Sequence, residues 1–451
     1  FDEKPFSPME IKDPPVEKRN GFRFTVQGPS DPLSDVFERF LSGPHIFRNR
    51  EVLRPDYIPS HLPHRKDEIV HLGKILAPSL DGVRCSNILI YGKTGTGKTA
   101  VAKYTLERLS RKGEEIDASI RNSYVNCRMA GTPYRVLANL CHSVDLEIPF
   151  TGLATGEVFD RLKNTVNNKH LLLICVLDEI DALVKDCGDS LLYELTRINE
   201  GLEFGKLTIV GVSNDLKFKE LLDPRVLSSL SEEEVVFKPY TALELKDILE
   251  DRAEAAFVKG RLTSGALSLC SALAASEHGD ARRALDLLRV AGELAEREGA
   301  SEVSEEHVRW AQEKIEKDRV VEVLTTLPLH SKIVMLGALL LKRGSHENST
   351  TGDLFEVYKE VSSKLGVDHL TQRRVSGLIN ELDLVGLINA RVVSFGRYGR
   401  TKRVSLGIPG EVSVEVFKRD PLFASMVNYS PRCLIHRHKN RIRVLRPDHI
   451  I

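Results

Sequence analysis

One glycine-rich stretch largely decides what this chain can fold into. Residues 91–100 read YGKTGTGKTA, which matches the pattern GxxxxGK[ST]. The apolar run Ile88–Ile90 precedes it, and residues 101–109 have the apolar spacing of an amphipathic helix. The sequence therefore predicts a strand, a loop and a helix, which is the context that a phosphate-binding loop requires. A glycine-rich turn with a solvated lysine is the alternative interpretation.

The residue types in this loop suit a bound triphosphate. Glycines let backbone N–H groups come close to phosphate oxygens at the positive end of a helix. Lys98 would reach the β- and γ-phosphates, and the Thr99 hydroxyl would take one coordination position on Mg²⁺. We therefore expect ATP or ADP with Mg²⁺ as cofactors. The loop residues expected to contact them are Gly92, Thr94, Gly95, Thr96, Gly97, Lys98, Thr99 and Ala100.

Two further apolar runs end in polar residues. Residues 171–177 lead into Asp178 and Glu179, and residues 206–213 lead into Asn214. In an open parallel sheet, such residues lie at the carboxyl edge of the strands, where ligands bind. Asp178 would hold Mg²⁺, Glu179 would polarise the attacking water, and Asn214 would bond the γ-phosphate or that water. Helix-capping acids and a turn asparagine are the alternative interpretations.

Three other segments carry weaker nucleotide signals. Residues 56–65, DYIPSHLPHR, precede the phosphate loop and could cover the purine, although a packed proline-rich connector fits equally well. Arg225 stands where an arginine could face a neighbouring subunit's phosphate, or it is an ordinary surface arginine. The pattern of residues 243–317 is helical throughout and predicts a small lid. Arg282 is the candidate that returns to the nucleotide, although two adjacent arginines at a helix start are more often solvated.

Composition narrows the class of protein. A chain of 451 residues suggests about three domains. Because 64 basic residues balance 64 acidic ones, any nucleic-acid affinity must come from a local basic face. The seven cysteines form no CxxC pair and predict reduced thiols of an intracellular protein. The longest apolar run, residues 333–341, is too short to span a membrane, so no membrane partner is expected.

The last third of the chain has the pattern of a winged helix. Apolar spacing predicts three helices at residues 333–341, 354–365 and 375–387, followed by a strand, a glycine tip and a strand up to residue 406. Residues 391–410 contain five basic residues and no acid, which suits a phosphate backbone or a minor groove. A solvated basic hairpin is the alternative. The candidates for DNA contact are Thr371, Gln372, Arg373 and Arg374 at a helix start, and Arg397, Tyr398, Gly399 and Arg400 at the tip.

Taken together, these features resemble the AAA+ replication initiators, the family of the archaeal and eukaryotic origin-recognition and helicase-loading proteins, and are most similar to the archaeal origin-binding form. The resemblance covers residues 43–410, and its most specific parts are the phosphate loop, Asp178-Glu179, Asn214, the GDAR sequence ending at Arg282, and the wing tip. It implies an α/β P-loop AAA+ ATPase core, an α-helical lid and a C-terminal winged-helix domain. The expected divisions are a partly disordered N-terminal extension (1–40), the core (41–240), the lid (241–317), the winged helix (318–412) and a basic tail (413–451).

The resemblance also implies roles for residues that no local pattern identifies. By similarity to the family, six further residues are implied to line the nucleotide pocket: Tyr57, Pro59, His64, Arg65, Tyr240 and Arg252. A helical insertion between residues 126 and 162 is implied to touch DNA. Relatives that act as ring ATPases often carry a second arginine after the Arg225 position, where this chain has Ser228 and Ser229. We therefore expect an ATPase with slow turnover.

The implied function is that of an ATP-binding initiator that binds duplex DNA at a replication origin and helps recruit or load the replicative helicase, with the ATP or ADP state as a switch. Another copy or a paralogue of the chain on DNA is a further expected partner. The implied location is cytoplasmic and nucleoid-associated. Two other functions fit the same motifs. One is a signalling or assembly ATPase whose winged helix packs on protein, and the other is a clamp-loader-like or remodelling ATPase with fast turnover.

Overall fold

The structure is a computed structural model, which describes Leu33, Phe37 and residues 45–149, 151–344, 349–394 and 400–432. The chain divides into Phe1–Pro44 and His45–Ile451, and every element below belongs to the second unit. Among the described residues, no helix is both long and apolar enough to cross a lipid bilayer. The six described cysteines are free thiols.

The core is built on a five-stranded parallel sheet with the strand order β2-β3-β4-β1-β5. All seven residues of β3 are buried, as its unbroken apolar run predicts. The register aligns Asn126 with Asp178, so polar residues at the ends of neighbouring strands meet at one edge. The strands are β1 (Ile88–Gly92), β2 (Ile120–Asn126), β3 (Leu172–Asp178), β4 (Lys206–Ser213) and β5 (Glu233–Phe237).

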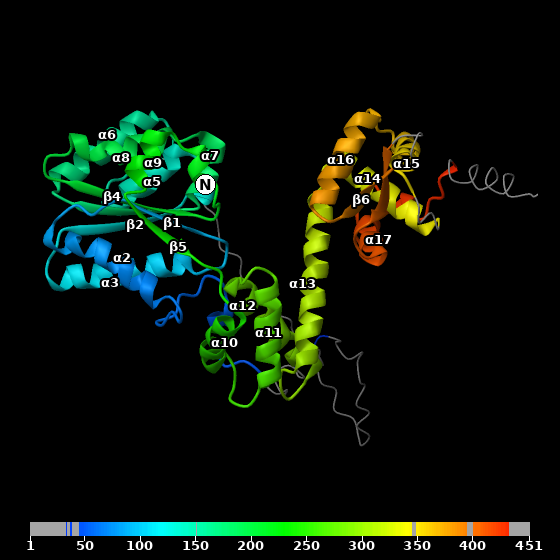
Figure 1. Ribbon diagram of the computed structural model, residues 1–451, viewed down its shortest axis with the longest axis horizontal. Coiled ribbons are helices and arrows are strands. Elements are labelled where there is room, and N and C mark those ends of the chain that lie inside the picture. Colours follow the sequence, from blue (N-terminus) through cyan, green and yellow to red (C-terminus); the bar gives the residue numbers. More distant parts are fainter. Residues whose placement is uncertain are drawn as a thin grey trace, which may run out of the picture. The chain divides into compact units, whose positions relative to one another are not determined.

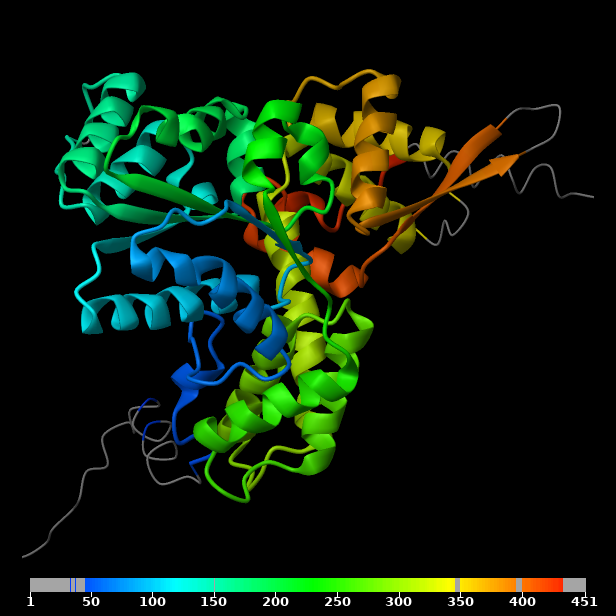
Figure 2. The same ribbon diagram turned by 60° about the vertical axis from the view of Figure 1, so that its left-hand side comes forward.

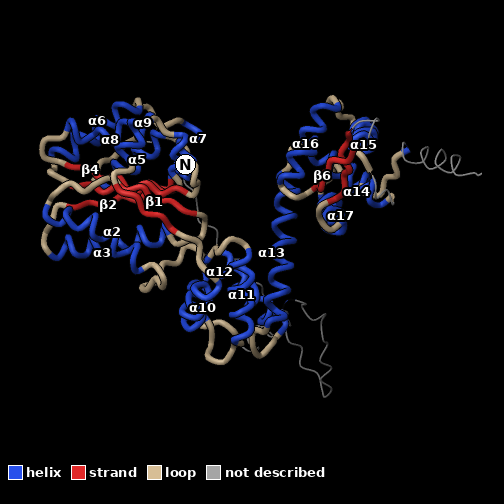
Figure 3. The backbone as a smooth tube through the Cα atoms, in the orientation of Figure 1, coloured by secondary structure: helices blue, strands red, loops and turns tan. Residues whose placement is uncertain are grey.

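Helices cover both faces of this sheet, as Figures 1 and 3 show. Each face has its own apolar cluster, because the side chains of a strand alternate between the two faces. One face carries α2 (Lys66–Leu76) and α3 (Lys98–Glu115). The other carries α5 (Pro133–Ser143), α6 (Thr155–Asn168), α7 (Ile180–Cys187), α8 (Ser190–Arg197) and α9 (Pro224–Leu230), with the short α4 (Cys127–Ala130) after β2. Single turns of 3₁₀ helix are η1 (Arg50–Leu53), η2 (Ala77–Asp81), η3 (Ile198–Gly201) and η4 (Phe218–Leu221).

Four helices follow the sheet and form the predicted lid. Thr241 starts the first of them with a capping box, in which its hydroxyl accepts from Glu244 N and the Glu244 carboxylate accepts from Thr241 N. Residues that precede the core pack into this lid, where the Phe47 and Phe257 ring centroids are 4.8 Å apart. The helices are α10 (Ala242–Ala256), α11 (Ser264–Ser276), α12 (Ala281–Glu298) and α13 (Glu305–Thr326).

The C-terminal region is a winged helix, so the prediction of three helices and a hairpin is confirmed. Its two strands pair in antiparallel fashion, with Ile388 opposite Leu406, and Figure 2 shows them in orange extending beyond the helices. The elements are α14 (Leu329–Arg343), α15 (Thr351–Lys364), α16 (Gln372–Leu384), β6 (Ile388–Ser394), β7 (Arg400–Leu406), α17 (Gly410–Arg419) and η6 (Ala424–Met426).

Two expected divisions fall inside continuous helices. The division after residue 317 lies within α13, which has no glycine or proline to interrupt it. The packing of α13 nevertheless changes there, because Val308 and Ala311 belong to the lid cluster and Leu324 belongs to the winged-helix cluster. The division after residue 412 lies within α17, so residues 413–432 are not a separate tail. They contribute Val416, Phe417, Phe423, Met426 and Val427 to the winged-helix core.

Candidate functional site: a nucleotide cavity between core and lid

The phosphate loop joins the end of β1 to the start of α3. Gly95 and Gly97 adopt φ values of 71° and 89°, in the left-handed region that favours glycine. A Cβ at Gly95 would overlap the Asp280 carboxylate, and one at Gly97 would lie 2.7 Å from the Tyr240 hydroxyl. Both glycines are therefore required by the backbone conformation and by the close approach of the lid.

Lys98 is buried beneath this loop. Its Nζ donates to the carbonyl oxygens of Gly92, at 2.9 Å, and Lys93, at 2.6 Å. Burial lowers the pKa of Lys98 to about 8, and the nearby Arg282 cation acts in the same direction while Asp178 opposes it. An anion in the cavity would favour the charged form of this lysine.

Asp178 and Thr99 place two oxygen ligands side by side. The Oδ2 atom of Asp178 accepts from Thr99 Oγ1 at 2.8 Å and from the Tyr124 hydroxyl at 2.7 Å. Burial, together with the hydrogen bond to Asp178, raises the pKa of Tyr124, so its phenol stays a donor. Mg²⁺ prefers oxygen ligands and usually takes one or two from the protein, the others coming from phosphates and water. The residues present therefore fit Mg²⁺.

Glu179 follows Asp178 in a conformation that is rare for a residue with a side chain, with φ 51° and ψ 43°. Its Oε1 accepts from Asn126 Nδ2 at 3.4 Å, and its Oε2 lies 3.7 Å from Arg128 Nη1. Asn214 follows β4, and its backbone N–H donates to Asp181 Oδ1 at 3.2 Å. Asp178, Glu179 and Asn214 all line one cavity, so the predicted edge-of-sheet cluster forms.

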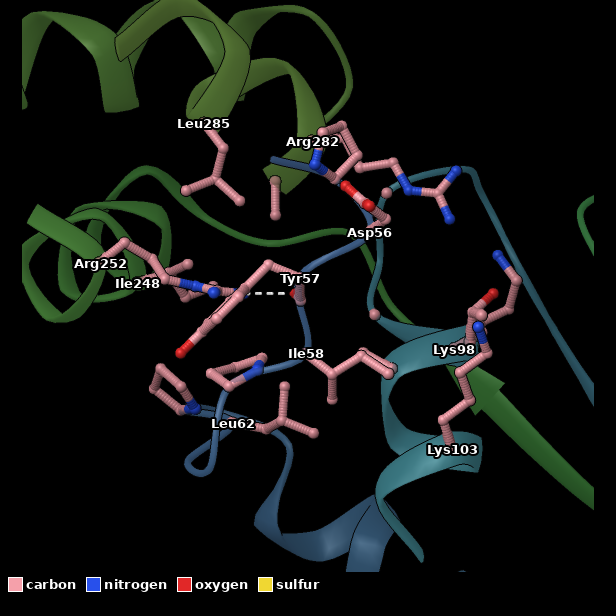
Figure 4. Close-up of a pocket in the computed structure, with 18 of the residues that line it drawn as sticks. Asp56, Tyr57, Ile58, Leu62, Lys98, Lys103, Ile248, Arg252, Arg282 and Leu285 are labelled. Atoms are coloured by element: carbon pink, nitrogen blue, oxygen red, sulfur yellow. Dashed lines mark hydrogen bonds between the residues drawn. The ribbon is translucent and has the colours of Figure 1, made fainter. Parts of the chain in front are cut away.

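This cavity has a volume of about 580 Å³ and lies between the core and the lid. Figure 4 shows how its lining is divided. Ile58, Leu62, Ile248 and Leu285 are apolar, whereas Arg282 points from the start of α12 towards the side where Lys98 and Lys103 lie. An apolar end beside a cationic end suits a purine joined to phosphates.

Contacts between segments far apart in the chain hold the lining in place. Arg252 of α10 donates to Val52 O at 3.1 Å and to Tyr57 O at 3.3 Å, and its guanidinium lies 4.8 Å from the centre of the Tyr57 ring. Burial lowers the pKa of Arg252. At the other end, Ala281 N donates to Gly95 O at 3.1 Å, which brings the first turn of α12 against the phosphate loop.

Most of the predicted nucleotide residues meet in this cavity. The structure brings together Tyr57, Pro59, Gly95, Gly97, Lys98, Thr99, Ala100, Asp178, Glu179, Asn214, Tyr240, Arg252 and Arg282 in its lining.

The other predicted residues lie elsewhere. Five of them are absent from the lining of the cavity: Gly92, Thr94, Thr96, His64 and Arg65. His64 Nε2 lies 2.8 Å from Asp247 Oδ2, and Arg65 is buried behind the loop. Arg225 is exposed and pairs with Asp223, which raises the pKa of the arginine. An exposed arginine is compatible with a contact to a second subunit, and that role stays a prediction.

Several residues of the cavity have no signal that is recognisable in the sequence alone. Tyr124 and Asn126 of β2 contact Asp178 and Glu179. Their alternation on one edge strand was a usable signal, but only once β2 is known to pair with β3. The lining also includes Lys103, Ile248 and Leu285, which no sequence pattern singled out, whereas Ile58 and Leu62 belong to the segment 56–65 that was expected to cover the purine.

The predicted DNA-contact residues are described only in part. Thr371 caps α16 by accepting from Arg374 N at 3.4 Å, and Gln372, Arg373 and Arg374 are exposed. Lys402 of β7 donates to Asn380 Oδ1 at 2.5 Å, which fixes the hairpin to α16. Arg397, Tyr398 and Gly399 lie outside the described residues, and of Arg400 only its place at the start of β7 is described.

Known protein families match the core, the lid and the winged helix of this chain. Models of three families match the chain: an AAA domain at residues 82–214, a Cdc6 AAA+ ATPase-type lid domain at 246–313, and the CDC6 C-terminal winged helix domain at 322–415. An ORC1-type DNA replication protein of Thermococcus onnurineus is 51% identical over 402 residues, which is 88% of this chain and 97% of that protein. This chain belongs to that family of replication initiators.

Other members of the Orc1/Cdc6 family agree with this assignment. The ORC1-type DNA replication protein of Pyrococcus abyssi is 53% identical over 392 residues, covering 86% of this chain and 94% of that protein. The solved structure of the Aeropyrum pernix ORC1 protein in complex with DNA is 50% identical, with a TM-score of 0.75, over 85% of this chain and 99% of that one. The predicted family and the AAA+ core, lid and winged helix are confirmed. The roles of single residues stay predictions.

Proposed function

We propose that this Orc1/Cdc6-family chain is an ATP-binding replication initiator. It binds duplex origin DNA, helps to recruit or load the replicative helicase, and changes its affinity for DNA or partner with the ATP or ADP state. The proposal rests on the cavity that the core and the lid share. The phosphate loop, the two carboxylates and the lid arginine Arg282 meet there, and the same chain continues into a winged helix. The solved relative that is bound to DNA supports the same conclusion.

Each polar group in the cavity has a role in binding or hydrolysing the nucleotide. Lys98 and Arg282 hold the phosphates, and Thr99 with Asp178 would hold Mg²⁺, which offsets negative charge on the phosphate oxygens when bound. Glu179 orients the attacking water, since its carboxylate lies beside Asp178 at the strand edge. Turnover is slow, because Asn126 and Arg128 hold Glu179 to one side and Ser228 and Ser229 stand where ring ATPases carry an arginine.

The DNA part rests on the start of α16 and on the basic hairpin. Gln372, Arg373 and Arg374 are exposed in the first turn of the helix, where side chains and N–H groups can meet phosphates and base edges. The core insertion around Arg128, Met129 and Arg135 is a second contact region, and Met129 is 83% exposed. The helix α13 belongs to both the lid and the winged helix, so a lid that responds to nucleotide can alter the DNA-binding domain.

The decisive experiment is fluorescence anisotropy of duplex DNA, titrated with the protein at several salt concentrations, with ATP, ADP or no nucleotide. Replacing Arg373 and Arg374 by alanine should weaken binding by about tenfold or more and lower the salt slope by about one per lost phosphate contact. Replacing Arg397 and Arg400 should act similarly. The matched control is the double alanine variant of Arg108 and Arg111, two exposed arginines on α3.

Three outcomes would count against parts of the proposal. Equal affinity for origin and random duplex in every nucleotide state would remove origin recognition. No DNA binding at all would favour a winged helix that packs on protein, as in a signalling ATPase. Fast hydrolysis that DNA stimulates and Glu179→Gln removes would favour a remodelling enzyme.

A further inference from the structure

Arg65 is a buried cation that does not line the nucleotide cavity. Only 4% of the residue is exposed. A buried guanidinium is costly unless its N–H groups find partners, so the partners of Arg65 indicate what it does. They come from segments that are far apart in the sequence.

The guanidinium joins the phosphate loop to the start of the lid. Its Nε donates to Thr96 O in the loop at 2.9 Å, and its Nη2 donates to Lys238 O at 2.7 Å. Lys238 belongs to the short link between β5 and α10, so it leads directly into the lid. Because the guanidinium is a planar fork, these two carbonyls are held at a fixed separation. Glu68 Oε1 accepts from Nη1 at 3.1 Å and neutralises the charge.

Tyr240 extends this connection. Its ring centre lies 3.9 Å from the Arg65 guanidinium, a cation–π contact, and its hydroxyl stands against Gly97 in the loop. Its backbone N–H donates to Gly279 O at 3.3 Å, in the turn before α12. Arg65 and Tyr240 together therefore contact the loop, the link and the turn that leads to Arg282.

The contact with Thr96 also orients a donor in the loop. In a trans peptide the carbonyl and the N–H point in opposite directions. Since the Thr96 carbonyl points to Arg65, the Gly97 N–H points away from it, and Gly97 lines the cavity. Losing this hydrogen bond would loosen the peptide group whose N–H is available to a phosphate.

We propose that Arg65 is a positioning residue that clamps the lid link onto the phosphate loop, through Thr96, Lys238 and Tyr240, and thereby sets nucleotide affinity without touching the nucleotide. This inference rests on the proposed nucleotide binding. It differs from the role in enclosing adenine that the family resemblance implies for Arg65.

The test is Arg65→Lys, which keeps the charge but offers a single ammonium in place of the fork. By titration calorimetry, affinity for ADP should fall about tenfold, as expected for a lost charged hydrogen bond. The ratio of ADP to IDP affinity should not change, because the purine is held elsewhere. Hydrogen exchange at the Tyr240 amide should become faster without any nucleotide.

Two further variants keep the test decisive. Arg343→Lys is the matched control, because Arg343 also donates to a main-chain carbonyl, Val427 O at 2.6 Å, in the winged helix. It should change none of the three readouts. Tyr240→Leu removes the ring partner, and combined with Arg65→Lys it should weaken ADP binding by less than the product of the single effects. The double variant is compared with the two single variants, so the comparison still reports the coupling of Arg65 and Tyr240 if each single variant is less stable.

Different results would overturn different statements. Unchanged ADP affinity and unchanged Tyr240 exchange in Arg65→Lys would refute the clamp, and an altered ratio of ADP to IDP affinity would show direct contact with the base. Wild-type protein that binds no ADP would instead refute the proposed function. The exchange measurement, made without nucleotide, would still decide whether Arg65 holds the link.

Discussion

At the scale of single residues, the site depends on polar groups that share partners. One oxygen of Asp178 accepts from both Thr99 and Tyr124, so the carboxylate is oriented before any ligand arrives. Lys98 is satisfied by two carbonyls of its own loop. The Lys98 ammonium and the Asp178 carboxylate are therefore already held in place for a phosphate and a metal ion, which reduces the reorganisation of these side chains on binding.

The depressed pKa of Lys98 gives a pH prediction. With a pKa of about 8 in the free protein, Lys98 is mostly charged at pH 7 and mostly neutral at pH 9. Bound phosphate raises that pKa, so binding above pH 8 must take up a proton. We expect ADP affinity to be about tenfold weaker at pH 9 than at pH 7.

Calorimetry in two buffers of different ionisation enthalpy measures this proton uptake directly. Lys98→Met should bind ADP far more weakly and take up no proton at this position. Circular dichroism at both pH values shows whether the fold is intact. Equal wild-type affinity at pH 7 and pH 9, without proton uptake, would show that Lys98 is charged throughout.

At the scale of elements, α17 decides where the winged helix ends. Its buried residues include Val416 and Phe417, and Phe423 follows in the same core with a ring centroid 5.5 Å from that of Phe417. Lys332 of α14 also donates to Asp420 Oδ2 at 3.1 Å. The helix is therefore part of the fold of this domain.

Truncation tests this role. A chain ending at residue 412 loses two buried phenylalanines, and each such loss costs about 3–5 kcal/mol, so the winged helix should unfold at physiological temperature. A chain ending at residue 432 retains every helix and strand that the structure describes, and it should melt as the full chain does. Thermal melting by circular dichroism compares the two, and equal melting of the 412 chain would contradict the packing of α17.

At the scale of the whole molecule, the core and lid share the nucleotide cavity, whereas the winged helix has an apolar cluster of its own. A ligand that binds only the folded state stabilises the part of the chain that holds its site. ADP at about 100 times its dissociation constant should add about 2.7 kcal/mol to the stability of the core and lid, and it should shift the winged-helix transition by less.

Differential scanning calorimetry can resolve the two transitions. The transition that ADP moves should be the one that Lys98→Ala makes insensitive to ADP. The chain ending at residue 412 identifies the other transition, since it should lack the winged-helix unfolding step. Equal shifts of both transitions with ADP would show that the domains unfold as one unit.

Features whose signal is local could be predicted from the amino-acid sequence. The phosphate loop from Gly92 to Lys98, the buried strand ending at Asp178 and the apolar spacing of the winged-helix elements each lie within about ten residues. Their residue types and their periodicity can therefore be recognised in the sequence alone.

The contacts between distant segments could not be predicted in this way and are seen in the folded chain. In the structure, Tyr124 donates to Asp178, Arg65 contacts Thr96 of the phosphate loop and lies outside the lining of the cavity, and α17 contributes to the winged-helix core. The physical reason is that the order of strands and the docking of a lid are set by packing between segments that are far apart in the chain. Hydrophobic periodicity shows which face of an element is buried, but not which element covers it.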